Sequence, residues 1–267
     1  MSINKKYIFP FICMLLTLTS CHGVDEDNVE FETVKADKTV VLSNEENSPT
    51  CMVHLSIEEA TEANGHRGEL INAAVMKRLL DREETSMKLA VEAFAEDYTR
   101  SYKENMLSLY NQDRADTTKR AWYQYHYIIE TSTQKGSKGT IVYLATIDYY
   151  EGGAHGINQQ ITMNFEAKTG RQLTLADIFA TGYEQPLKTV LLKALKAKTG
   201  CNSLSALHDK GYLYSMDIFP SENFILSEEA ITFIYNPYEI APYAMGSTEL
   251  IIPFGDVEKI LKNSFQY

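Results

Sequence analysis

The spacing of apolar residues changes along the chain and predicts two helices followed by an antiparallel sheet. Apolar side chains first recur every three or four positions, which predicts helices over Glu69–Leu80 and Ser86–Tyr110. The period then drops to two, which predicts strands over Ala121–Glu130, Thr140–Tyr150 and Ile157–Phe165. Because turn-rich connectors separate these strands, we expect an antiparallel meander with one face on a core.

Shorter elements flank this sheet. Thr39–Leu42 and Met52–Ile57 alternate like short strands ahead of the helices. After the sheet, Thr174 stands three residues before Asp177, a capping-box pattern that predicts the start of a short helix, and Tyr183–Lys198 predicts a longer one. The last third is expected to hold strands over Phe224–Leu226, Ala230–Tyr235 and Glu249–Pro253 and a closing helix over Asp256–Asn263.

This order of elements is typical of the α+β class, with an antiparallel sheet and packed helices. The change of period near residue 115 indicates a boundary between two modules. We therefore expect a smaller N-terminal module of strands and helices over residues 36–115 and a C-terminal α+β module over residues 116–267.

The chain begins like the precursor of a bacterial lipoprotein. Lys5 and Lys6 precede an apolar run of about thirteen residues, which is too short to span a bilayer. The run ends in Leu-Thr-Ser-Cys at residues 18–21, which matches a lipobox. This predicts a signal peptide over residues 1–20 and lipidation of Cys21; the alternative is a plain secretory signal with an incidental cysteine.

Lipidation places the protein in the cell envelope. Two or more acyl chains give stable attachment, so we expect an anchor at the outer membrane, on its periplasmic or surface-exposed face. Residues 21–35 are polar and lack periodicity, which predicts a flexible tether. Its acidic run Asp25–Asp27 resembles a cell-surface export tag, with plain solvation of the tether as the alternative.

The sequence has 4 cysteines, of which Cys13 leaves with the signal peptide and Cys21 carries lipid. Cys51 and Cys201 remain in an oxidising compartment, where a pair usually forms a disulfide. We therefore expect a Cys51–Cys201 bridge, with two buried thiols as the alternative. No Cys-x-x-Cys motif occurs, which argues against a zinc ribbon.

Charge narrows the choice of partners. Asp and Glu number 36 against 25 Lys and Arg, for a net charge of −11. No basic excess is left for phosphate backbones, which argues against nucleic-acid binding. Acidic residues stand in predicted loops or helix faces, namely Glu58-Glu59, Glu83-Glu84, Glu222 and Glu228-Glu229. If they cluster on one face, they would steer a cationic protein; general solubility is the alternative.

Three segments carry a resemblance to a known family. They are Tyr-Glu-Gly-Gly-Ala-His-Gly at residues 150–156, Leu-Thr-Leu-Ala-Asp-Ile-Phe at 173–179, and Tyr-Asn-Pro-Tyr-Glu-Ile-Ala-Pro-Tyr-Ala-Met-Gly at 235–246. In this order they resemble the domain of unknown function at the extracytoplasmic end of RsiV-type anti-sigma factors, a module common in bacterial lipoproteins. The resemblance implies an α+β ectodomain preceded by a smaller module.

The same resemblance implies a ligand, because those ectodomains sense lysozyme by binding it directly. This sequence departs from the anti-sigma factors in lacking their transmembrane helix and their sigma-binding segment. Only the binding half of their activity is therefore expected to transfer to this chain.

The glycine-rich link between two predicted strands is the first candidate site. Gly152, Gly153 and Gly156 predict a tight turn with positive φ or a close backbone approach. His155, framed by these glycines, would present an imidazole to a ligand with Glu151 nearby, or would hydrogen-bond its own loop.

Exposed aromatic residues are the second lead. Trp122, Tyr238 and Tyr243 are candidates for contact with a protein or a sugar ring, and packing in the sheet core is the alternative. No two histidines stand three to five residues apart and no His-Glu-x-x-His occurs, so we expect no metal site and no cofactor.

No catalytic signature stands out, so the sequence favours binding over catalysis. We expect a lipid-anchored, non-catalytic envelope protein that recognises a cationic protein such as lysozyme or a cell-wall component. The alternatives are a carboxylate-dependent hydrolase of cell-wall or host glycan and a structural accessory subunit of an envelope complex.

Overall fold

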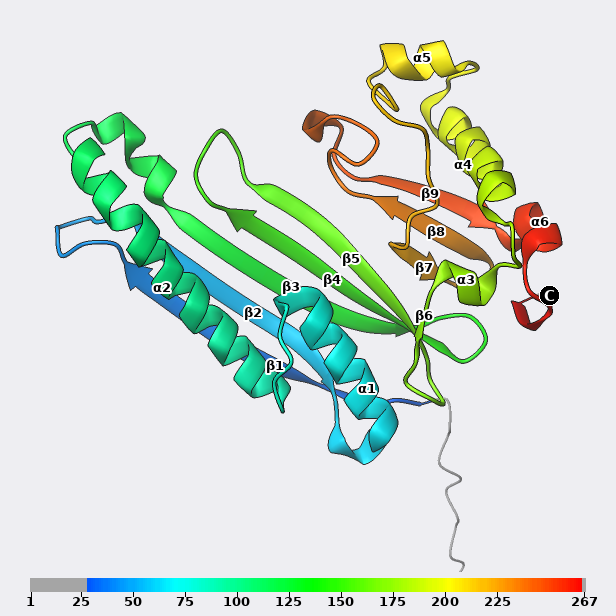
Figure 1. Ribbon diagram of the computed structural model, residues 1–267, viewed down its shortest axis with the longest axis horizontal. Helices are drawn as coiled ribbons and strands as arrows, with labels where there is room; N and C mark the ends of the chain where they lie inside the picture. The colour runs from blue at the N-terminus through cyan, green and yellow to red at the C-terminus, as the bar shows by residue number, and fades with distance from the viewer. Residues whose placement is uncertain (1–27, 266–267) are drawn as a thin grey trace, which may run out of the picture.

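The structure, a computed structural model, describes residues 28–265 and contains two β-sheets in this range (Figure 1). The larger sheet has six strands in the order β1-β2-β3-β4-β5-β6 and the smaller has three in the order β7-β8-β9, which confirms the α+β class. The strands are β1 (Phe31–Val41), β2 (Thr50–Ala60), β3 (Tyr125–Lys135), β4 (Thr140–Tyr150), β5 (Ile157–Glu166), β6 (Gln172–Leu173), β7 (Phe224–Leu226), β8 (Ala230–Tyr235) and β9 (Thr248–Pro253). The α-helices are α1 (His66–Val75), α2 (Met87–Asp113), α3 (Leu175–Ile178), α4 (Glu184–Thr199), α5 (Leu204–Asp209) and α6 (Phe254–Val257). The π-helical segment η2 (Met76–Leu80) continues α1, and the 3-10 helices are η1 (Glu62–Asn64), η3 (Thr117–Tyr123), η4 (Tyr243–Met245), η5 (Glu258–Ile260) and η6 (Asn263–Phe265).

Local sequence signals account for the ends of several helices. The Ser86 side chain accepts a hydrogen bond from the backbone N–H of Leu89 and starts α2. The Asp177 carboxylate accepts from the backbone N–H of Thr174 at the start of α3, as the capping-box pattern predicts. Gly200, with a φ of 70°, ends α4 in the left-handed conformation.

The first strand starts earlier than the sequence pattern indicates. Residues 31–35, expected to be tether, belong to β1, which pairs antiparallel with β2. Phe31 and Val34 pack against the core, whereas Glu32 and Lys35 are exposed. Charged side chains are typical of an edge strand, where they discourage pairing with other chains. The same charges give the segment the polar composition of a tether.

A parallel pairing joins the two expected modules into one sheet. β2 pairs in parallel with β3, which places Cys51 beside Tyr125. The intervening α1 and α2 lie across one face of the sheet (Figure 1) and supply the crossover that a parallel pair requires. The boundary expected near residue 115 therefore does not separate two cores.

The buried side chains form two hydrophobic cores that divide between Ala167 and Leu173. The first lies between the larger sheet and the helices α1 and α2, and the second packs on the smaller sheet. Cys51 belongs to the first core and Cys201 to the second, and both are free thiols. The expected disulfide is therefore wrong: each thiol is buried as a small apolar side chain in its own core.

Asparagine side chains connect the two sheets. On β5, Thr162 and Asn164 are 5% and 1% exposed, although their polar alternation is typical of a solvent face. The Asn164 amide donates to the carbonyl oxygen of Phe224 at 2.7 Å, and its oxygen accepts from the N–H of Leu226 at 3.0 Å. Asn164 thus satisfies two backbone groups of β7 that a strand partner would otherwise satisfy.

Two further asparagines repeat this arrangement from the other side. Asn223 accepts from the N–H of Thr162 and donates to the carbonyl of Gln160, both at 2.8 Å. Asn236 accepts from the N–H of Gln160 at 2.8 Å and donates to its carbonyl at 2.9 Å. The backbone of β5 is therefore held by side chains of the second half of the chain.

Several expectations concern residues that the structure does not describe. The signal peptide, Cys21 and the acidic run Asp25–Asp27 lie outside residues 28–265. Within that range, no helix combines the length and the apolar composition that crossing a bilayer requires.

Candidate functional site

The glycine-rich connection between β4 and β5 lies at one end of the larger sheet. Gly152 and Gly153 have φ values of +85° and +93°. A Cβ atom on Gly152 would lie 2.8 Å from the carbonyl oxygen of Trp122, so this position requires glycine. Gly156 does not have a positive φ, but a Cβ atom there would lie 3.0 Å from the carbonyl oxygen of Tyr149. The glycines therefore set the path of the turn.

Three of the expected contact residues gather into one aromatic cluster. His155 stacks on Tyr243 with a ring-centroid distance of 3.8 Å and an interplanar angle of 14°. Its Nε2 lies 3.2 Å from the hydroxyl of Tyr238, and its Nδ1 lies 2.9 Å from the carbonyl oxygen of Gly156. A carbonyl only accepts, so Nδ1 carries the proton and Nε2 accepts from the Tyr238 hydroxyl. The imidazole is thus hydrogen-bonded at both nitrogens.

Glu151 and Trp122, the other two expected contact residues, lie apart from this cluster. The hydroxyl of Tyr98 donates to the Glu151 carboxylate at 2.8 Å, which directs Glu151 toward α2. Trp122 on η3 is 53% exposed, and its backbone carbonyl lies beside Gly152. Glu151 and His155 flank the same glycines, but Glu151 contacts α2 whereas His155 contacts Tyr238 and Tyr243.

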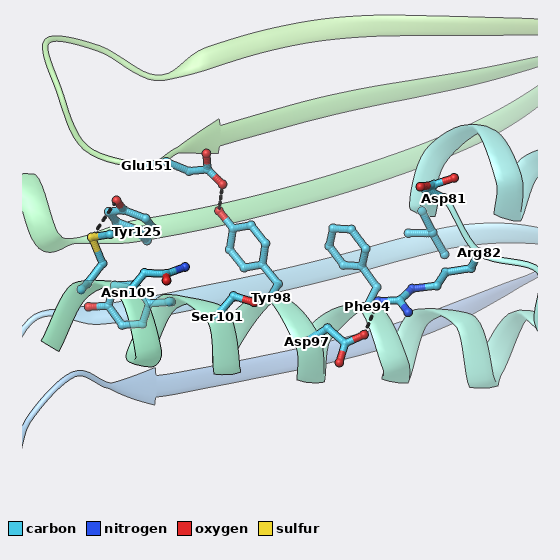
Figure 2. A pocket seen from close by; sticks show the side chains of 12 residues that line it. Asp81, Arg82, Phe94, Asp97, Tyr98, Ser101, Asn105, Tyr125 and Glu151 are labelled. Carbon is cyan, nitrogen blue, oxygen red and sulfur yellow. Dashed lines mark hydrogen bonds and ion pairs between the residues drawn. The ribbon is translucent and has the colours of Figure 1, made fainter.

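Glu151 lines a cavity of about 600 Å³ between α2 and the start of β3, which we call the aromatic groove (Figure 2). Aromatic side chains from α2 and β3 form its walls, and Arg82 and Asp97 form an ion pair at one end. The volume falls within the usual range of ligand sites. The aromatic members of the lining are Phe94, Tyr98, Tyr102 and Tyr125.

Burial and the charge of Glu151 shape the acid–base properties of this groove. Burial is the main cause that raises the pKa of Tyr98, and the hydrogen bond to Glu151 raises it further. Burial, followed by the charge of Glu151, raises the pKa of Cys51 to about 12. In contrast, hydrogen bonds from Arg82 and Arg100 lower the pKa of Asp97. These groups therefore keep a single protonation state at neutral pH.

A second cavity, of about 820 Å³, lies where the end of β2, α1 and the start of α2 meet. We call it the acidic cleft, because five glutamates and one lysine are the charged residues of its lining. Two acidic pairs noted in the sequence each contribute one member to it. The charged residues are Glu32, Glu59, Glu62, Glu69, Glu84 and Lys88.

Among these glutamates, Glu59 alone is half-buried, and its pKa departs from the ordinary value. Burial is the main cause that raises its pKa, and the charges of Glu32 and Glu62 raise it further. A hydrogen bond from the backbone of Met87 acts in the opposite direction. Like charges thus converge in the acidic cleft without full compensation.

Sequence reasoning missed both cavities. Phe94, Tyr98 and Tyr102 follow helical spacing, which is also the signature of a core face, and Phe94 and Tyr98 are indeed half-buried. The groove becomes visible only when Glu151 is placed against α2. Among residues 28–265, no three His, Cys, Asp or Glu side chains are grouped so that they could hold a metal ion.

Comparison with known proteins finds one matching family profile. The profile of a family described as a protein of unknown function, DUF3298, matches residues 176–255. None of the curated proteins matches the chain. The profile therefore covers most of the second core and leaves the larger sheet outside it.

Solved structures extend the similarity to both cores. A DUF3298 family member from Bacteroides fragilis is 30% identical, with a TM-score of 0.80, over 88% of this chain and 94% of that chain. A DUF3298 family protein from Pseudomonas aeruginosa is 16% identical, with a TM-score of 0.61, over 90% of this chain and 98% of that chain. At this lower identity the second comparison shows a shared fold.

Proposed function

The chain belongs to the DUF3298 family, and from that premise we propose that it is a non-catalytic, lipid-anchored binding protein of the bacterial cell envelope that captures a cationic protein in its acidic cleft. The observation that carries this proposal is the convergence of five glutamates on one cavity of about 820 Å³, with Lys88 as the one cation of its lining.

The electrostatics of the cleft favour a cationic occupant. Glu59 already experiences the charges of Glu32 and Glu62, which raise its pKa. A lysine or arginine entering the cleft would reduce this repulsion and replace lost hydration with ion pairs. Complementary charge of this kind raises the association rate and selects basic partners over acidic ones.

The resemblance to RsiV-type ectodomains supplies lysozyme as the candidate partner. Two of the segments that carry this resemblance contribute His155 and the pair Tyr238 and Tyr243, which form one cluster on the surface. This cluster joins the first half of the chain to the second and supports a common architecture. Lysozyme is strongly basic and suits an acidic cleft.

The proposed location rests on the first residues of the chain. Lys5 and Lys6, the apolar run and the lipobox support lipidation at Cys21 and an outer-membrane anchor. The test is metabolic labelling with a fatty acid: the full chain should incorporate label and the Cys21→Ser variant should not. Equal labelling of both proteins would contradict the anchor.

The partner is tested by measuring lysozyme binding to the full chain in detergent at about 20 and about 300 mM salt. Specific recognition predicts micromolar or tighter binding at the higher salt, because contacts other than charge survive screening. An unrelated protein of similar acidity is the control. Binding that disappears at high salt, or equal binding by the control protein, would leave only nonspecific attraction.

A matched pair of double variants tests the acidic cleft itself. Glu62→Gln with Glu84→Gln removes two exposed charges of the cleft, whereas Glu228→Gln with Glu229→Gln removes two exposed charges elsewhere. The first pair should weaken lysozyme binding about tenfold and the second should change it less than about twofold. Equal effects of the two pairs would show that binding depends on net charge and not on the acidic cleft.

The hydrolase alternative finds no support in the aromatic groove. Glycoside hydrolysis requires one carboxyl group with a raised pKa as general acid beside a second carboxylate. Asp97, a carboxylate of this groove, has its pKa lowered by Arg82 and Arg100. The ion pairs of Asp97 therefore favour its ionised form, which makes it unsuitable as the general acid of such an enzyme.

A further inference from the structure

Glu151 carries a charge that the protein does not neutralise. Its carboxylate accepts the hydroxyl of Tyr98 at 2.8 Å. Within residues 28–265, no Lys, Arg or His forms an ion pair with it. The other two carboxylates of the aromatic groove do have cationic partners, because Asp97 pairs with Arg82 and Arg100, and Asp81 with Lys77 at 2.8 Å. Glu151 is thus the uncompensated anion of this cavity.

Aromatic rings of α2 and of the sheet pack together beside the ring of Tyr98, the hydrogen-bond partner of this anion. Phe94 and Tyr98 stack with a centroid distance of 5.9 Å and an interplanar angle of 11°. Tyr127 on β3 tilts against both, at 5.1 Å and 5.0 Å. Tyr102 and Tyr125 form a second pair at 5.0 Å. Phe94, Tyr98 and Tyr125 are only half-buried, so their rings remain accessible from the groove (Figure 2).

Hydrogen bonds hold these rings in place. The Tyr102 hydroxyl donates to the carbonyl oxygen of Tyr123 at 2.8 Å, and the Tyr125 hydroxyl lies 3.2 Å from the sulfur of Met106. Together with the bond from Tyr98 to Glu151, these contacts fix the ring orientations before any ligand arrives. A site with pre-set side chains loses less conformational entropy when it binds.

We propose that the aromatic groove binds an organic cation, with an ammonium or guanidinium group that pairs with Glu151 and lies against the faces of Phe94, Tyr98 and Tyr125. Aromatic faces attract cations through the negative charge of their π-systems, and the attraction increases when the cation is desolvated. The neighbouring carboxylate adds a direct ion pair.

The cavity holds more than the charged group. Its volume of about 600 Å³ exceeds what a single ammonium group fills. Ser101 and Asn105 lie four residues apart on α2, along one side of the groove, and both are exposed. Their neutral polar groups would hydrogen-bond the remainder of a ligand whose cation lies at Glu151.

This site is independent of the acidic cleft, because no residue lines both cavities. The same cationic chemistry is available from a free amine or from a basic side chain of a peptide. A neutral saccharide, which also stacks on aromatic rings, would use the groove without needing the charge of Glu151. These ligands therefore separate in a direct titration.

The test is calorimetric titration of the full chain in detergent with choline, with its neutral isostere 3,3-dimethylbutan-1-ol, with the tripeptide acetyl-Gly-Arg-Gly-amide and with an N-acetylglucosamine oligomer. We expect choline or the arginine tripeptide to bind at least about tenfold more tightly than the neutral alcohol. Tighter choline binding identifies a free amine, and tighter tripeptide binding identifies a basic side chain. If neither choline nor the tripeptide binds more tightly than the alcohol, or if the saccharide alone binds, the proposal is overturned.

Three variants locate the binding. Glu151→Gln keeps an acceptor for the Tyr98 hydroxyl and should weaken cation binding about tenfold. Phe94→Leu keeps apolar volume without a π-face and should weaken it a few-fold. Glu228→Gln is the matched control, because it makes the same change of side chain at an exposed glutamate that lines neither cavity, and it should leave affinity unchanged.

Melting temperatures of the variants verify folding. Should Glu151→Gln not fold, Phe94→Leu and the comparison of choline with its isostere on the unmodified chain decide the matter. Wild-type affinity in a folded Glu151→Gln variant would refute the role of this carboxylate. If the two sites are independent, the Glu151→Gln variant should lose choline binding and keep lysozyme binding.

Discussion

The two cores differ in how completely helices cover their sheets, and this difference indicates which half of the molecule has room for a ligand. In the first, α2 lies over a sheet of six strands, and cavities of about 600 and 820 Å³ border this helix. A helix is about 10 Å wide, whereas six strands span roughly 25 Å, so even with α1 beside it α2 leaves part of the sheet open. In the second, three strands present a narrower face to α4 and α6, and the cavities there are smaller, about 350 and 300 Å³.

The side chains follow the same division. The first core contains half-buried tyrosines such as Tyr98, Tyr125 and Tyr127, whereas the second contains fully buried leucines and phenylalanines such as Leu187 and Phe233. Half-buried aromatic side chains combine contact area with a polar group and are typical of binding surfaces. The first, more open half of the molecule therefore carries the two larger cavities, whereas the cluster of His155, Tyr238 and Tyr243 lies between the two halves.

The largest expected effect is a difference in stability between two phenylalanines. Phe233 is 0% exposed in the second core, so Phe233→Ala should lower the free energy of unfolding by about 3–5 kcal/mol. Phe94 is half-buried at the aromatic groove, so Phe94→Ala should cost about 1–2 kcal/mol. Urea unfolding followed by circular dichroism measures both. Equal costs would show that the two cores are equally closed.

The second prediction concerns the connection between the halves. Asn164→Ala should cost about 2–3 kcal/mol, because the N–H of Leu226 is left buried without an acceptor. Asn158→Ala is the matched control: the residue lies on the same strand and face but is exposed, and the change should cost less than about 0.5 kcal/mol. The same urea titration applies. A similar cost for both would contradict the role of Asn164 in joining the sheets.

This connection also marks the limit of prediction from sequence. Strict alternation on β5 correctly indicates a strand, and the bounds of β7 and β8 agree with their apolar runs. The polar face of β5 reads as solvent-exposed, because its partners Asn223 and Asn236 lie 61 to 76 residues away along the chain. Local periodicity has no information about such distant partners.

The candidate site, like the fold, was predictable from the sequence only in part. Exposed aromatics and a glycine-framed histidine pointed to His155, Tyr238 and Tyr243, which do meet, although 83 residues separate His155 from Tyr238. The disulfide failed because elimination left two cysteines without saying where the fold places them. The cavities were missed because helical spacing alone does not distinguish a covered face from the wall of a groove.

The third prediction uses two neighbouring glycines at the edge between the halves. Gly153→Ala introduces a side chain at a φ of +93° in open space and should cost about 1 kcal/mol. Gly152→Ala adds an approach of 2.8 Å to the carbonyl oxygen of Trp122 and should cost about 2 kcal/mol. Thermal unfolding of the two variants measures the difference. A larger cost at Gly153 would mean that the contact with Trp122 does not determine the turn.

The smallest effect tests the acidic cleft through pH. Burial, together with Glu32 and Glu62, raises the pKa of Glu59 above its ordinary value of 4.5, so the folded state binds this proton more tightly than the unfolded state. The resulting stabilisation is complete below pH 4.5 and is lost as pH rises through the raised pKa. Ionised Glu59 therefore destabilises the fold at neutral pH.

Removing this charge should reverse the effect. Glu59→Gln keeps an acceptor for the backbone of Met87 and should raise the melting temperature at about pH 7, with no gain at about pH 3.5 where the carboxyl is protonated in both states. The gain is small because solvent screens a half-exposed group. Glu228→Gln, an exposed glutamate outside the cleft, is the control and should change neither temperature. A gain that persists at the lower pH would arise from packing instead of charge, and the convergence of like charges would then no longer distinguish this open half of the molecule.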